Sequence, residues 1–317
     1  MSSFWHRLPK PFFVQAPMED VTDAAFRMMI ARHGRPHVMF TEFTSADGLV
    51  LAPESGQKVL RRKLSFHEVE RPIVAQLFSA RPERMERAAV IAAELGFDGI
   101  DINMGCPAKE VVSAGCGAGM IKNPPLAQEM VRAAQRGAPG IPISVKTRIG
   151  YSRDETETWV PALLETELAA LTIHARTRDE MSDVPARWEH VAHAVSIRDA
   201  MGVETVILGN GDVKDIADAR ARAAATGCDG VMLGRAIYGN PWLYADRADA
   251  PSPQERIAAL MEHIRLFEEL MLETQNYAVM KKHFKAYISG WDGAKDLRAR
   301  LMETNEPGEA LEVLRGA

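Results

Sequence analysis

Cys106 lies at a position where a thiol could take part in catalysis. It stands between Gly105 and Pro107, directly after the run Gly99–Ile102, whose alternation is typical of a buried strand. In α/β barrels, the chemistry is found at the carboxyl ends of such strands. A cysteine that only filled the core would more often lie inside the apolar run. Cys106 is therefore a candidate catalytic thiol, with a purely structural cysteine as the alternative.

Nearly every other expected strand is also followed by polar residues or by glycine. Parallel strands of a barrel end at one rim, so these residues would face one another there. Folding alone gives no reason for so many strand ends to agree, and we expect the residues to form one site. They are Pro17, Met18, Gln76, Asn103, Lys146, His174, Asn210, Gly211, Asp212, Gly234 and Arg235.

The last two strand ends indicate the kind of ligand. Glycine-containing loops at Asn210–Asp212 and Gly234–Arg235 let backbone N–H groups approach a phosphate, and the arginine adds a permanent positive charge. Cationic and polar residues lie across the rim, which suggests a phosphorylated planar cofactor over the barrel mouth, and FMN fits. A cation near the N1–C2=O edge would stabilise the reduced anionic flavin. Ordinary glycine-rich turns are the alternative. No Gly-x-Gly-x-x-Gly motif opens a first βαβ unit, so a Rossmann site is not indicated.

A repeated pattern supplies the elements that would position these residues. Eight β-rich runs alternate with six segments that suit helices, and prolines at 82 and 124 and glycines at 96, 137, 202 and 227 mark helix starts and ends. This predicts an α/β fold, a (β/α)₈ TIM barrel, with a doubly wound sheet as the alternative. The runs are Phe12–Ala16, Val38–Thr41, Ile73–Leu77, Gly99–Ile102, Ile143–Lys146, Ala170–His174, Thr205–Leu208 and Gly230–Leu233. The expected helices are Asp23–His33, Pro82–Leu95, Pro124–Arg136, Glu155–Glu165, Trp188–Met201 and Val213–Thr226.

The pattern changes near residue 250. Pro251-Ser252-Pro253 interrupts it, and only helical periods follow, at Gln254–Thr274, Tyr277–Ser289 and Ala294–Glu303. We therefore expect a catalytic barrel domain over residues 1–248 and a small helical domain over residues 249–317.

Composition sets further limits on function. With 46% hydrophobic and 26% charged residues and a net charge of −5, the chain is typical of a globular protein and shows no overall bias toward nucleic acid. The three cysteines, at 106, 116 and 228, have no metal-ligand spacing and form no even disulfide set, so we expect no metal and a reducing, cytoplasmic location. Residues 1–10 lack the apolar core of a signal peptide, and no run suits a membrane span.

Taken in order, the motifs resemble those of the tRNA-dihydrouridine synthase family over roughly residues 11–245. The similar segments are Ala16-Pro17-Met18 with Val21-Thr22-Asp23 and Phe26-Arg27, Asn103-Met104-Gly105-Cys106-Pro107 with Gly115-x-Gly117-Ala118, Val145-Lys146-x-Arg148, His174-x-Arg176-Thr177-Arg178, Gly209-Asn210-Gly211-Asp212, and Gly230 through Gly234-Arg235 to Gly239-Asn240-Pro241-Trp242. Lys281-Lys282-His283-Phe284 also resembles part of the family's C-terminal helical domain.

The resemblance implies a specific chemistry. It implies FMN held by Pro17, Met18, Gln76, Lys146, His174, Asn210, Gly211, Asp212, Gly234 and Arg235. It implies Cys106 as the proton donor and NADPH as the electron source. It also implies a flipped-out uridine of RNA, with tRNA as the favoured RNA, held in part by Asn103 with Arg176 and Arg178 near the nucleic acid. A thiol suits the role of acid because its ordinary pKa of about 8.5 keeps it mostly protonated at neutral pH.

RNA binding by an acidic chain requires a local basic surface. Residues 281–300 carry six cations and two acids, and we expect Lys281, Lys282 and Lys285 to contact RNA, with Phe284, Tyr287 and Trp291 able to stack on bases. A solvated helix face is the alternative, and it is the favoured interpretation of Arg61–Lys63. No stable protein partner and no membrane are implied.

Two segments depart from the family pattern. Glu19-Asp20 stands where small residues are common, and Asp179–Trp188 replaces a stretch that usually contains Gln, Tyr and Gly. The uridine position and the RNA species therefore stay open. Two other functions are alternatives: a flavin enzyme acting on a free pyrimidine, and a non-catalytic RNA-binding protein.

Overall fold

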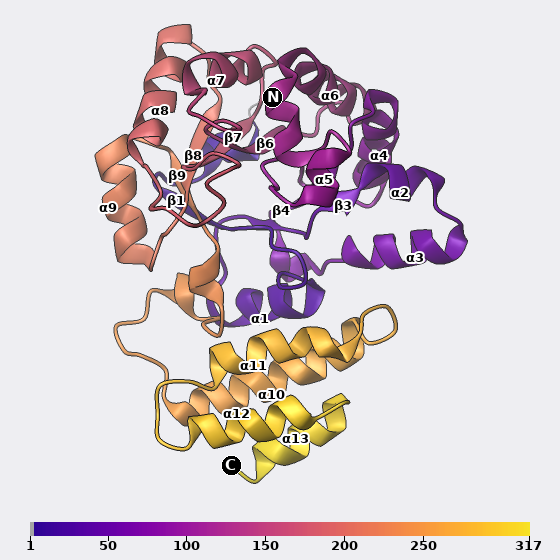
Figure 1. Ribbon diagram of the computed structural model, residues 1–317, viewed down its shortest axis with the longest axis vertical. Helices are drawn as coiled ribbons and strands as arrows, with labels where there is room; N and C mark the ends of the chain where they lie inside the picture. Colours follow the sequence, from indigo (N-terminus) through magenta and orange to yellow (C-terminus); the bar gives the residue numbers. More distant parts are fainter. Residues whose placement is uncertain (1–2) are drawn as a thin grey trace.

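A computed structural model describes residues 3–317 and contains a parallel β-barrel followed by a group of helices (Figure 1). The sheet order is β1-β9-β8-β7-β6-β5-β4-β2, and an isolated parallel bridge between Val14 and Val38 joins its two ends. The strands are β1 (Phe12–Gln15), β2 (Met39–Phe40), β4 (Ile73–Phe78), β5 (Gly99–Met104), β6 (Ile143–Arg148), β7 (Ala170–His174), β8 (Val206–Asn210) and β9 (Gly230–Leu233). Each overlaps one of the eight predicted runs, with β4, β5, β6 and β8 extending one or two residues beyond their runs, and the predicted (β/α)₈ barrel is confirmed. A short ninth strand, β3 (Thr44–Ser45), pairs with the end of β4.

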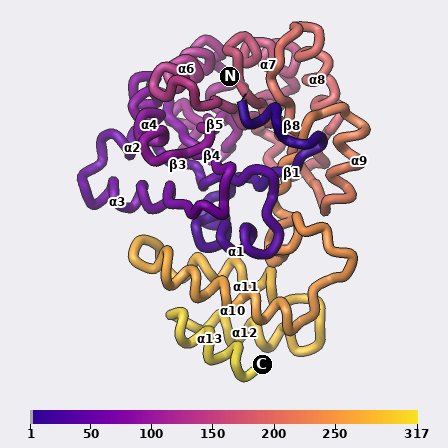
Figure 2. The backbone as a smooth tube through the Cα atoms, turned by 180° about the vertical axis from the view of Figure 1, so that it is seen from behind, coloured from indigo at the N-terminus to yellow at the C-terminus, as the bar shows by residue number. Residues whose placement is uncertain are grey.

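The barrel interior has an apolar lower layer and a polar upper layer. Alternate residues of the strands point inward, and the lower ones, including Phe12, Phe40 and Leu208, form a buried cluster. Trp5 belongs to this cluster and comes from the 3₁₀ helix η1 (Phe4–Arg7), which precedes β1 at the N-terminal end of the strands (Figure 2). The next inward positions carry polar side chains, so the chemistry is concentrated at the carboxyl ends of the strands.

Six helices cover the outside of the barrel, as predicted. They are α1 (Ala24–Gly34), α4 (Pro82–Glu94), α6 (Pro124–Gly137), α7 (Thr156–Leu164), α8 (Glu189–Met201) and α9 (Ile216–Thr226). Gly202 and Gly227 end α8 and α9 in the left-handed conformation, as expected for helix C-caps. Gly137 has a different role: a Cβ there would lie 2.1 Å from the carbonyl oxygen of Glu86, so this glycine allows α6 to approach α4.

Several short helices were not predicted. These are α2 (Ala46–Leu51), α3 (Glu54–Lys63), α5 (Lys109–Ser113), η2 (Glu68–Glu70), η3 (Gly117–Lys122), η4 (Arg235–Ile237) and η5 (Leu243–Ala245). The helix α3 has no buried residue and projects from the side of the barrel (Figure 1). It therefore lacks the buried apolar face on which sequence periodicity depends.

Beyond β9 the chain forms four helices below the barrel, coloured orange to yellow in Figure 1. They are α10 (Pro253–Leu270), α11 (Lys281–Tyr287), α12 (Ala294–Glu303) and α13 (Pro307–Arg315), with η6 (Tyr277–Met280) before α11. A capping box between Ser252 and Glu255 begins α10, which packs against α1 of the barrel. The helical C-terminal region agrees with the sequence pattern, although α13 was not expected; the exact domain division at 248/249 stays a prediction.

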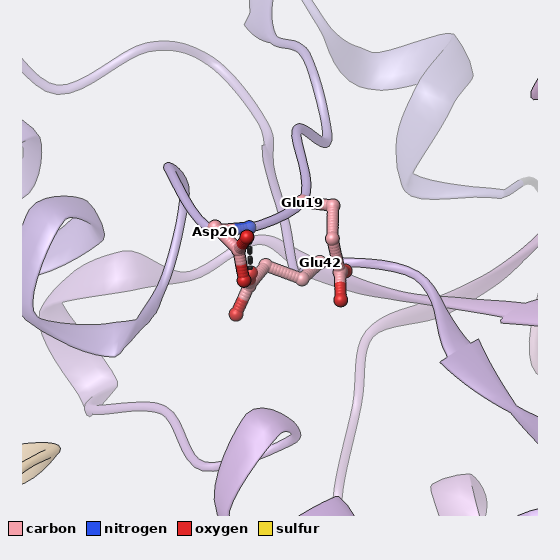
Figure 3. Close-up of side chains that lie close together, drawn as sticks. All are labelled: Glu19, Asp20 and Glu42. Carbon is pink, nitrogen blue, oxygen red and sulfur yellow. Dashed lines mark hydrogen bonds between the residues drawn. The ribbon is translucent and has the colours of Figure 1, made fainter. Parts of the chain in front are cut away.

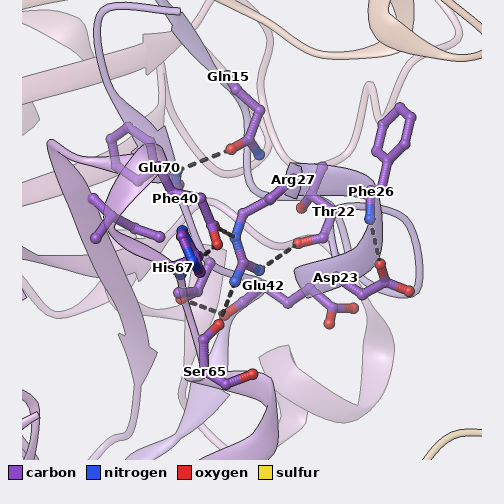
Figure 4. Close-up of polar contacts among 12 residues, drawn as sticks. Gln15, Thr22, Asp23, Phe26, Arg27, Phe40, Glu42, Ser65, His67 and Glu70 are labelled. Atoms are coloured by element: carbon purple, nitrogen blue, oxygen red, sulfur yellow. Dashed lines mark hydrogen bonds and ion pairs between the residues drawn. The ribbon is translucent and has the colours of Figure 1, made fainter. Parts of the chain in front are cut away.

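A buried ion pair fixes the segment that follows β1. Arg27 of α1 and Glu70 of η2 are almost completely buried, and their side chains meet at 2.7 Å (Figure 4). The same guanidinium donates to the carbonyl oxygens of Thr22 and Ser65. The arginine therefore fastens the Val21–Asp23 turn, which lies next to Met18, to a neighbouring loop. Among the described residues, no helix is long and apolar enough to cross a membrane.

Candidate active site

A cavity of about 210 Å³ opens at the carboxyl ends of the strands. Nine of the ten residues predicted to bind a cofactor line it. They are spread through the sequence from Pro17 to Arg235, and the barrel brings them together at one rim. The lining consists of Ala16, Pro17, Met18, Lys146, His174, Arg176, Ser182, Asn210, Gly211, Asp212, Val213, Met232, Gly234 and Arg235. Gln76 is the predicted cofactor residue that is absent from this lining.

Two neighbouring side chains of the cavity lining, Lys146 and His174, differ in charge. Burial lowers the pKa of Lys146 to about 8, with a further contribution from Arg148, while the nearby Asp101 opposes the shift. Burial and the surrounding cations lower the pKa of His174 well below its usual value, so the imidazole is neutral at pH 7. Its Nε2 lies 3.0 Å from Nη1 of Arg176 and must accept that hydrogen bond, which leaves Nδ1 as the protonated nitrogen. The site therefore combines one charged donor with one neutral donor.

The part of the cavity formed by Gly211, Asp212 and Arg235 lies beside His174 and has the features of an anion site. Gly211 has φ +125°, and a Cβ on it would lie 2.7 Å from the Cβ of Ala186, so no larger residue fits there. Asp212 pairs with Arg176 and, at 2.6 Å, with Arg235. Although burial opposes ionisation, the hydrogen bonds from Arg176 and the Ala186 N–H lower the pKa of Asp212. Asp212 thus orients the arginine, while the guanidinium of Arg235, whose side chain is 65% exposed, retains donors for an anion.

The position of Arg176 does not favour the predicted contact with RNA. Its side chain is 2% exposed and is engaged by Asp212, His174 and the carbonyl oxygen of Val184. This placement favours a role in holding the unusual 179–188 segment, in which Ala186 N–H also donates to Asp212. Arg178 is more exposed, and donates to the carbonyl oxygen of Pro107 beside the cysteine. The predicted RNA role can therefore apply to Arg178 far more readily than to Arg176.

Hydrogen bonds from Asn103 and Ala118 help to hold the backbone around Cys106. The side-chain Oδ1 of Asn103 accepts hydrogen bonds from the N–H groups of Gly105 and Cys106, at 3.1 and 2.9 Å. The carbonyl oxygen of Cys106 accepts from Ala118 N–H at 3.0 Å. Gly117 makes that contact possible, because a Cβ there would lie 2.7 Å from the same oxygen. The loop is thus rigid on both sides of the thiol.

The Cys106 thiol is suited to donating a proton. Burial raises its pKa, although the Ala108 N–H and the charges of Arg148 and Lys146 act in the opposite direction. The thiol is therefore protonated at neutral pH. Cys116 and Cys228 are buried, with 4% and 5% exposure, whereas Cys106 is partly exposed. Only Cys106 of the three cysteines combines partial access with a position at the barrel rim.

Gln76 and Asn103 are joined in a polar chain inside the barrel. Asn103 donates from Nδ2 to Oε1 of Gln76 at 3.1 Å, and Gln76 donates from Nε2 to Asp101 at 2.7 Å. Because Oδ1 of Asn103 is occupied by the cysteine loop, its second Nδ2 hydrogen is what it can offer to a substrate carbonyl. Gln76 and Asn103 are among the residues predicted from the sequence, whereas Asp101, which is completely buried, is not.

The unusual Glu19-Asp20 pair belongs to an acidic cluster beside the site. Carboxylate oxygens of Glu19, Asp20 and Glu42 lie within 4.8 Å of one another, and Glu42 accepts from the Asp20 N–H (Figure 3). Lys63 pairs with Glu19, and Lys282 of α11 pairs with Asp20 at 2.8 Å. The two lysines supply the compensating positive charge, and Lys282 links the C-terminal helices to the loop after β1.

The predicted basic surface forms a groove between α11 and α12. Its volume is about 380 Å³, and its lining comprises Lys281, Lys282, Lys285, Lys295, Arg298, Ala299 and Met302. Two of these lysines already have partners, since Lys281 donates to the carbonyl oxygen of Met302 and Lys282 to Asp20. The expected stacking by Phe284 and Tyr287 is wrong: both rings are fully buried in the packing of the C-terminal helices.

Comparison with known proteins places this geometry in context. The family model described as "Dihydrouridine synthase (Dus)" matches residues 14–317. A Bacillus subtilis protein named "Probable tRNA-dihydrouridine synthase 2" is 40% identical over 314 residues, covering 98% of this chain and 95% of its own. A Staphylococcus epidermidis protein named "Probable tRNA-dihydrouridine synthase" has the same identity and the same coverage of both chains.

Solved structures share the fold at low sequence identity. A morphinone reductase complex with tetrahydroNAD has a TM-score of 0.53 and 14% identity, covering 76% of this chain and 88% of its own. Histamine dehydrogenase from Rhizobium sp. 4-9 has a TM-score of 0.55 and 15% identity, covering 80% and 48%. These similarities support the barrel architecture alone.

Proposed function

The chain belongs to the dihydrouridine synthase family, and from this we propose that it reduces the C5=C6 bond of uridines in RNA, most specifically tRNA, with FMN as cofactor and NADPH as electron donor. The relatives that cover nearly the whole chain carry the tRNA-dihydrouridine synthase name, which supports the reaction and the RNA substrate. The identities of the flavin and the proton donor are our inferences from the site residues and the family resemblance, and NADPH as electron donor is inferred from that resemblance alone.

The residues at the rim fit a flavin mononucleotide. Gly211 and Gly234 lie beside Arg235, where backbone and guanidinium donors would hold one phosphate. A Cβ on Gly234 would meet Ala16 and the Met18 sulfur at 3.5 and 3.6 Å, so the two sides of the cavity are close. Lys146 and the Nδ1–H of His174 would donate to the polar edge of the ring. One phosphate region in the cavity favours FMN over a dinucleotide.

The proposed reaction adds a hydride to C6 and a proton to C5 of uracil. A bound FMN would pass on the hydride that NADPH supplies. Cys106 donates its proton to C5, and the resulting thiolate is reprotonated from solvent. The raised pKa of this thiol keeps the proton in place until reaction, and a positioned acid of this kind typically contributes about 10²–10⁴-fold to the rate. Asn103 would orient the base through its remaining Nδ2 hydrogen.

The substrate base has to leave its stack to reach this cavity. A base inside a helix cannot approach a group at the bottom of a barrel mouth, so the RNA must present it extruded. The basic groove of α11 and α12 and the partly exposed Arg178 supply cationic contacts to the surrounding phosphates. Binding would therefore depend on the RNA backbone as well as on the base.

The observation that carries the proposal is that Cys106, Asn103 and the residues we predict to bind the cofactor come from the carboxyl ends of the strands in a chain of this family. The test incubates the purified, FMN-reconstituted protein with NADPH and unmodified tRNA transcript, and with free uracil. We expect dihydrouridine to form in the RNA, with little turnover of free uracil. Equal turnover of free uracil would favour the free-pyrimidine alternative. Mapping dihydrouridine in all RNA of a strain that lacks the gene would identify the position.

A further inference from the structure

A buried carboxylate lies at one end of the hydrogen-bond chain that leads to Cys106. Asp101 is completely buried in β5, and it accepts hydrogen bonds at 2.7 Å from Ser144 Oγ and from Gln76 Nε2. The strand register explains the contact, since Gln76, Asp101 and Ser144 are direct neighbours across β4, β5 and β6. Asn103, two residues after Asp101, points to the same inner face.

The carboxylate determines the direction of every hydrogen bond in the chain. An ionised carboxylate only accepts, so Gln76 must turn its Nε2 toward Asp101 and its Oε1 toward Asn103. Asn103 must then turn Nδ2 toward Gln76, which leaves Oδ1 for the N–H groups of Gly105 and Cys106. Reversal of Gln76 would set its Oε1 against the carboxylate and its Nε2 against Nδ2 of Asn103. Reversal of Asn103 would present a donor to two backbone donors.

We propose that Asp101 is a positioning residue for Cys106, which acts through Gln76 and Asn103 and never contacts the substrate. The hydrogen-bond chain from Asp101 through Gln76 sets the orientation of the Asn103 amide, and this amide holds the loop that carries Cys106. Asp101 therefore controls the position of the proton donor. The catalytic part of this inference rests on the proposed function, whereas the control of the loop does not.

The choice of substitutions follows from donor and acceptor counting. In Asp101→Asn, Oδ1 can still accept from Gln76 while Nδ2 donates to Ser144, whose hydroxyl can turn to the Ile100 carbonyl oxygen at 3.4 Å. The directions of the hydrogen bonds from Asn103 to Gln76 and from Gln76 to position 101 are therefore unchanged. In Asp101→Leu, the Gln76 amide loses its acceptor and is buried without a partner, so Asn103 loses its fixed neighbour. Ser144→Ala removes a donor from the same carboxylate without changing the direction, and serves as the matched control.

The primary measurement is amide hydrogen exchange of Gly105 and Cys106 in the flavin-loaded protein, together with the alkylation rate of Cys106 by iodoacetamide. We expect Asp101→Leu to accelerate both by about tenfold or more, while Asp101→Asn and Ser144→Ala stay within about threefold of wild type. Reduction of RNA uridine at saturating substrate should fall about tenfold in the leucine variant, with flavin reduction by NADPH unchanged. Unchanged exchange in the leucine variant, or an asparagine variant as impaired as leucine, would overturn the proposal.

A charge exchange keeps the idea testable if the leucine variant does not fold. Asn103→Asp alone places carboxylates on both sides of Gln76, which has one amide nitrogen to offer, so the protein should lose stability as the pH rises. In the double variant Asp101→Asn with Asn103→Asp, Gln76 can reverse and all groups are again paired at unchanged net charge. We expect the double variant to recover most of the stability and loop protection. Simple addition of the two single effects would contradict the proposed chain.

These readouts separate two different failures. Exchange and alkylation report on the loop without any RNA, so they test Asp101 even if the protein acts on another substrate. Conversely, absence of dihydrouridine formation with normal loop behaviour in wild type and the control variants would count against the proposed function alone.

Discussion

Arg148 donates from Nε to the carbonyl oxygen of Gly105 at 2.8 Å, and so ties the end of β6 to the loop that carries Cys106. Its Nη1 donates at 2.9 Å to the carbonyl oxygens of Thr177 and Met181. One buried guanidinium therefore joins the loop that carries Cys106 to the neighbouring unusual segment, residues 179–188. Multiple fixed donors suit an arginine better than a lysine at such a junction.

Replacement of the thiol should separate the two halves of the proposed reaction. We expect Cys106→Ala to slow uridine reduction by at least about 10²-fold, because a positioned acid is removed. Flavin content and NADPH oxidation should stay near wild type. Single-turnover assays with RNA measure the first effect and stopped-flow flavin reduction the second. Cys116→Ala is the matched control; a larger defect in that variant would show that the acid has been misassigned.

Substitution at Gly211 should prevent cofactor binding. Its φ of +125° disfavours any side chain, and a Cβ would lie 2.7 Å from that of Ala186. We expect Gly211→Ala to purify with little FMN, measured by absorbance and by chromatography of the heat-released cofactor. Gly308→Ala, where nothing lies within 4 Å, should retain full flavin content. Release of FAD from wild type, or a fully loaded Gly211→Ala protein, would refute the phosphate site.

The affinity of the apoprotein for FMN should depend on pH through Lys146. With a pKa of about 8, this lysine is protonated below that pH and loses its charge above it. A cation favours binding of the anionic cofactor, so affinity should decrease as the pH rises through the pKa of the lysine. Quenching of flavin fluorescence measures it. Lys146→Arg keeps its charge over this range and should flatten the dependence; an equally steep slope in that variant would assign the effect to another group.

The basic groove should contribute to RNA binding in proportion to the phosphates that it neutralises. We expect Lys281, Lys282 and Lys285 changed together to Ala to weaken RNA binding and to reduce the log–log salt slope by roughly 0.7–0.9 for each phosphate that is no longer neutralised. Flavin content should not change. Because Lys282 also pairs with Asp20, Asp20→Asn is the control for removal of that ion pair, and asparagine tolerates the φ of +54° found there. An unchanged salt slope in the triple variant would instead favour a solvated surface.

The buried ion pair between Arg27 and Glu70 should make a large contribution to the stability of the folded protein. We expect Glu70→Ala to reduce the free energy of unfolding by about 3–5 kcal/mol, because it leaves the buried Arg27 unpaired. Glu68→Ala in the same short helix removes an exposed, solvent-screened pair with Arg71 and should change the free energy of unfolding far less. Chemical denaturation measures both. Similar effects in the two variants would show that burial of the pair is not decisive.

The barrel and most of its rim follow from the pattern of the chain alone. Alternating apolar runs identify strands because inward and outward side chains alternate, and the polar residue after each run falls at the shared carboxyl edge. Cys106, Lys146, His174 and Arg235 could therefore be assigned to one site before any contact was known. The short helix α3 escaped prediction because it has no buried face.

Which polar and aromatic residues are available to a ligand depends on how the chain folds. Arg176 and Phe284 look like RNA contacts in the chain, but both are buried, since spacing shows which face a residue occupies and not what covers that face. The unusual pair Glu19-Asp20 is explained by Lys63 and Lys282, which are distant in sequence but form ion pairs with Glu19 and Asp20 in the folded protein. Asp101 lies inside an apolar run, and its sequence position does not reveal its role. The importance of a buried carboxylate lies in its partners, and these come from neighbouring strands that only folding brings together.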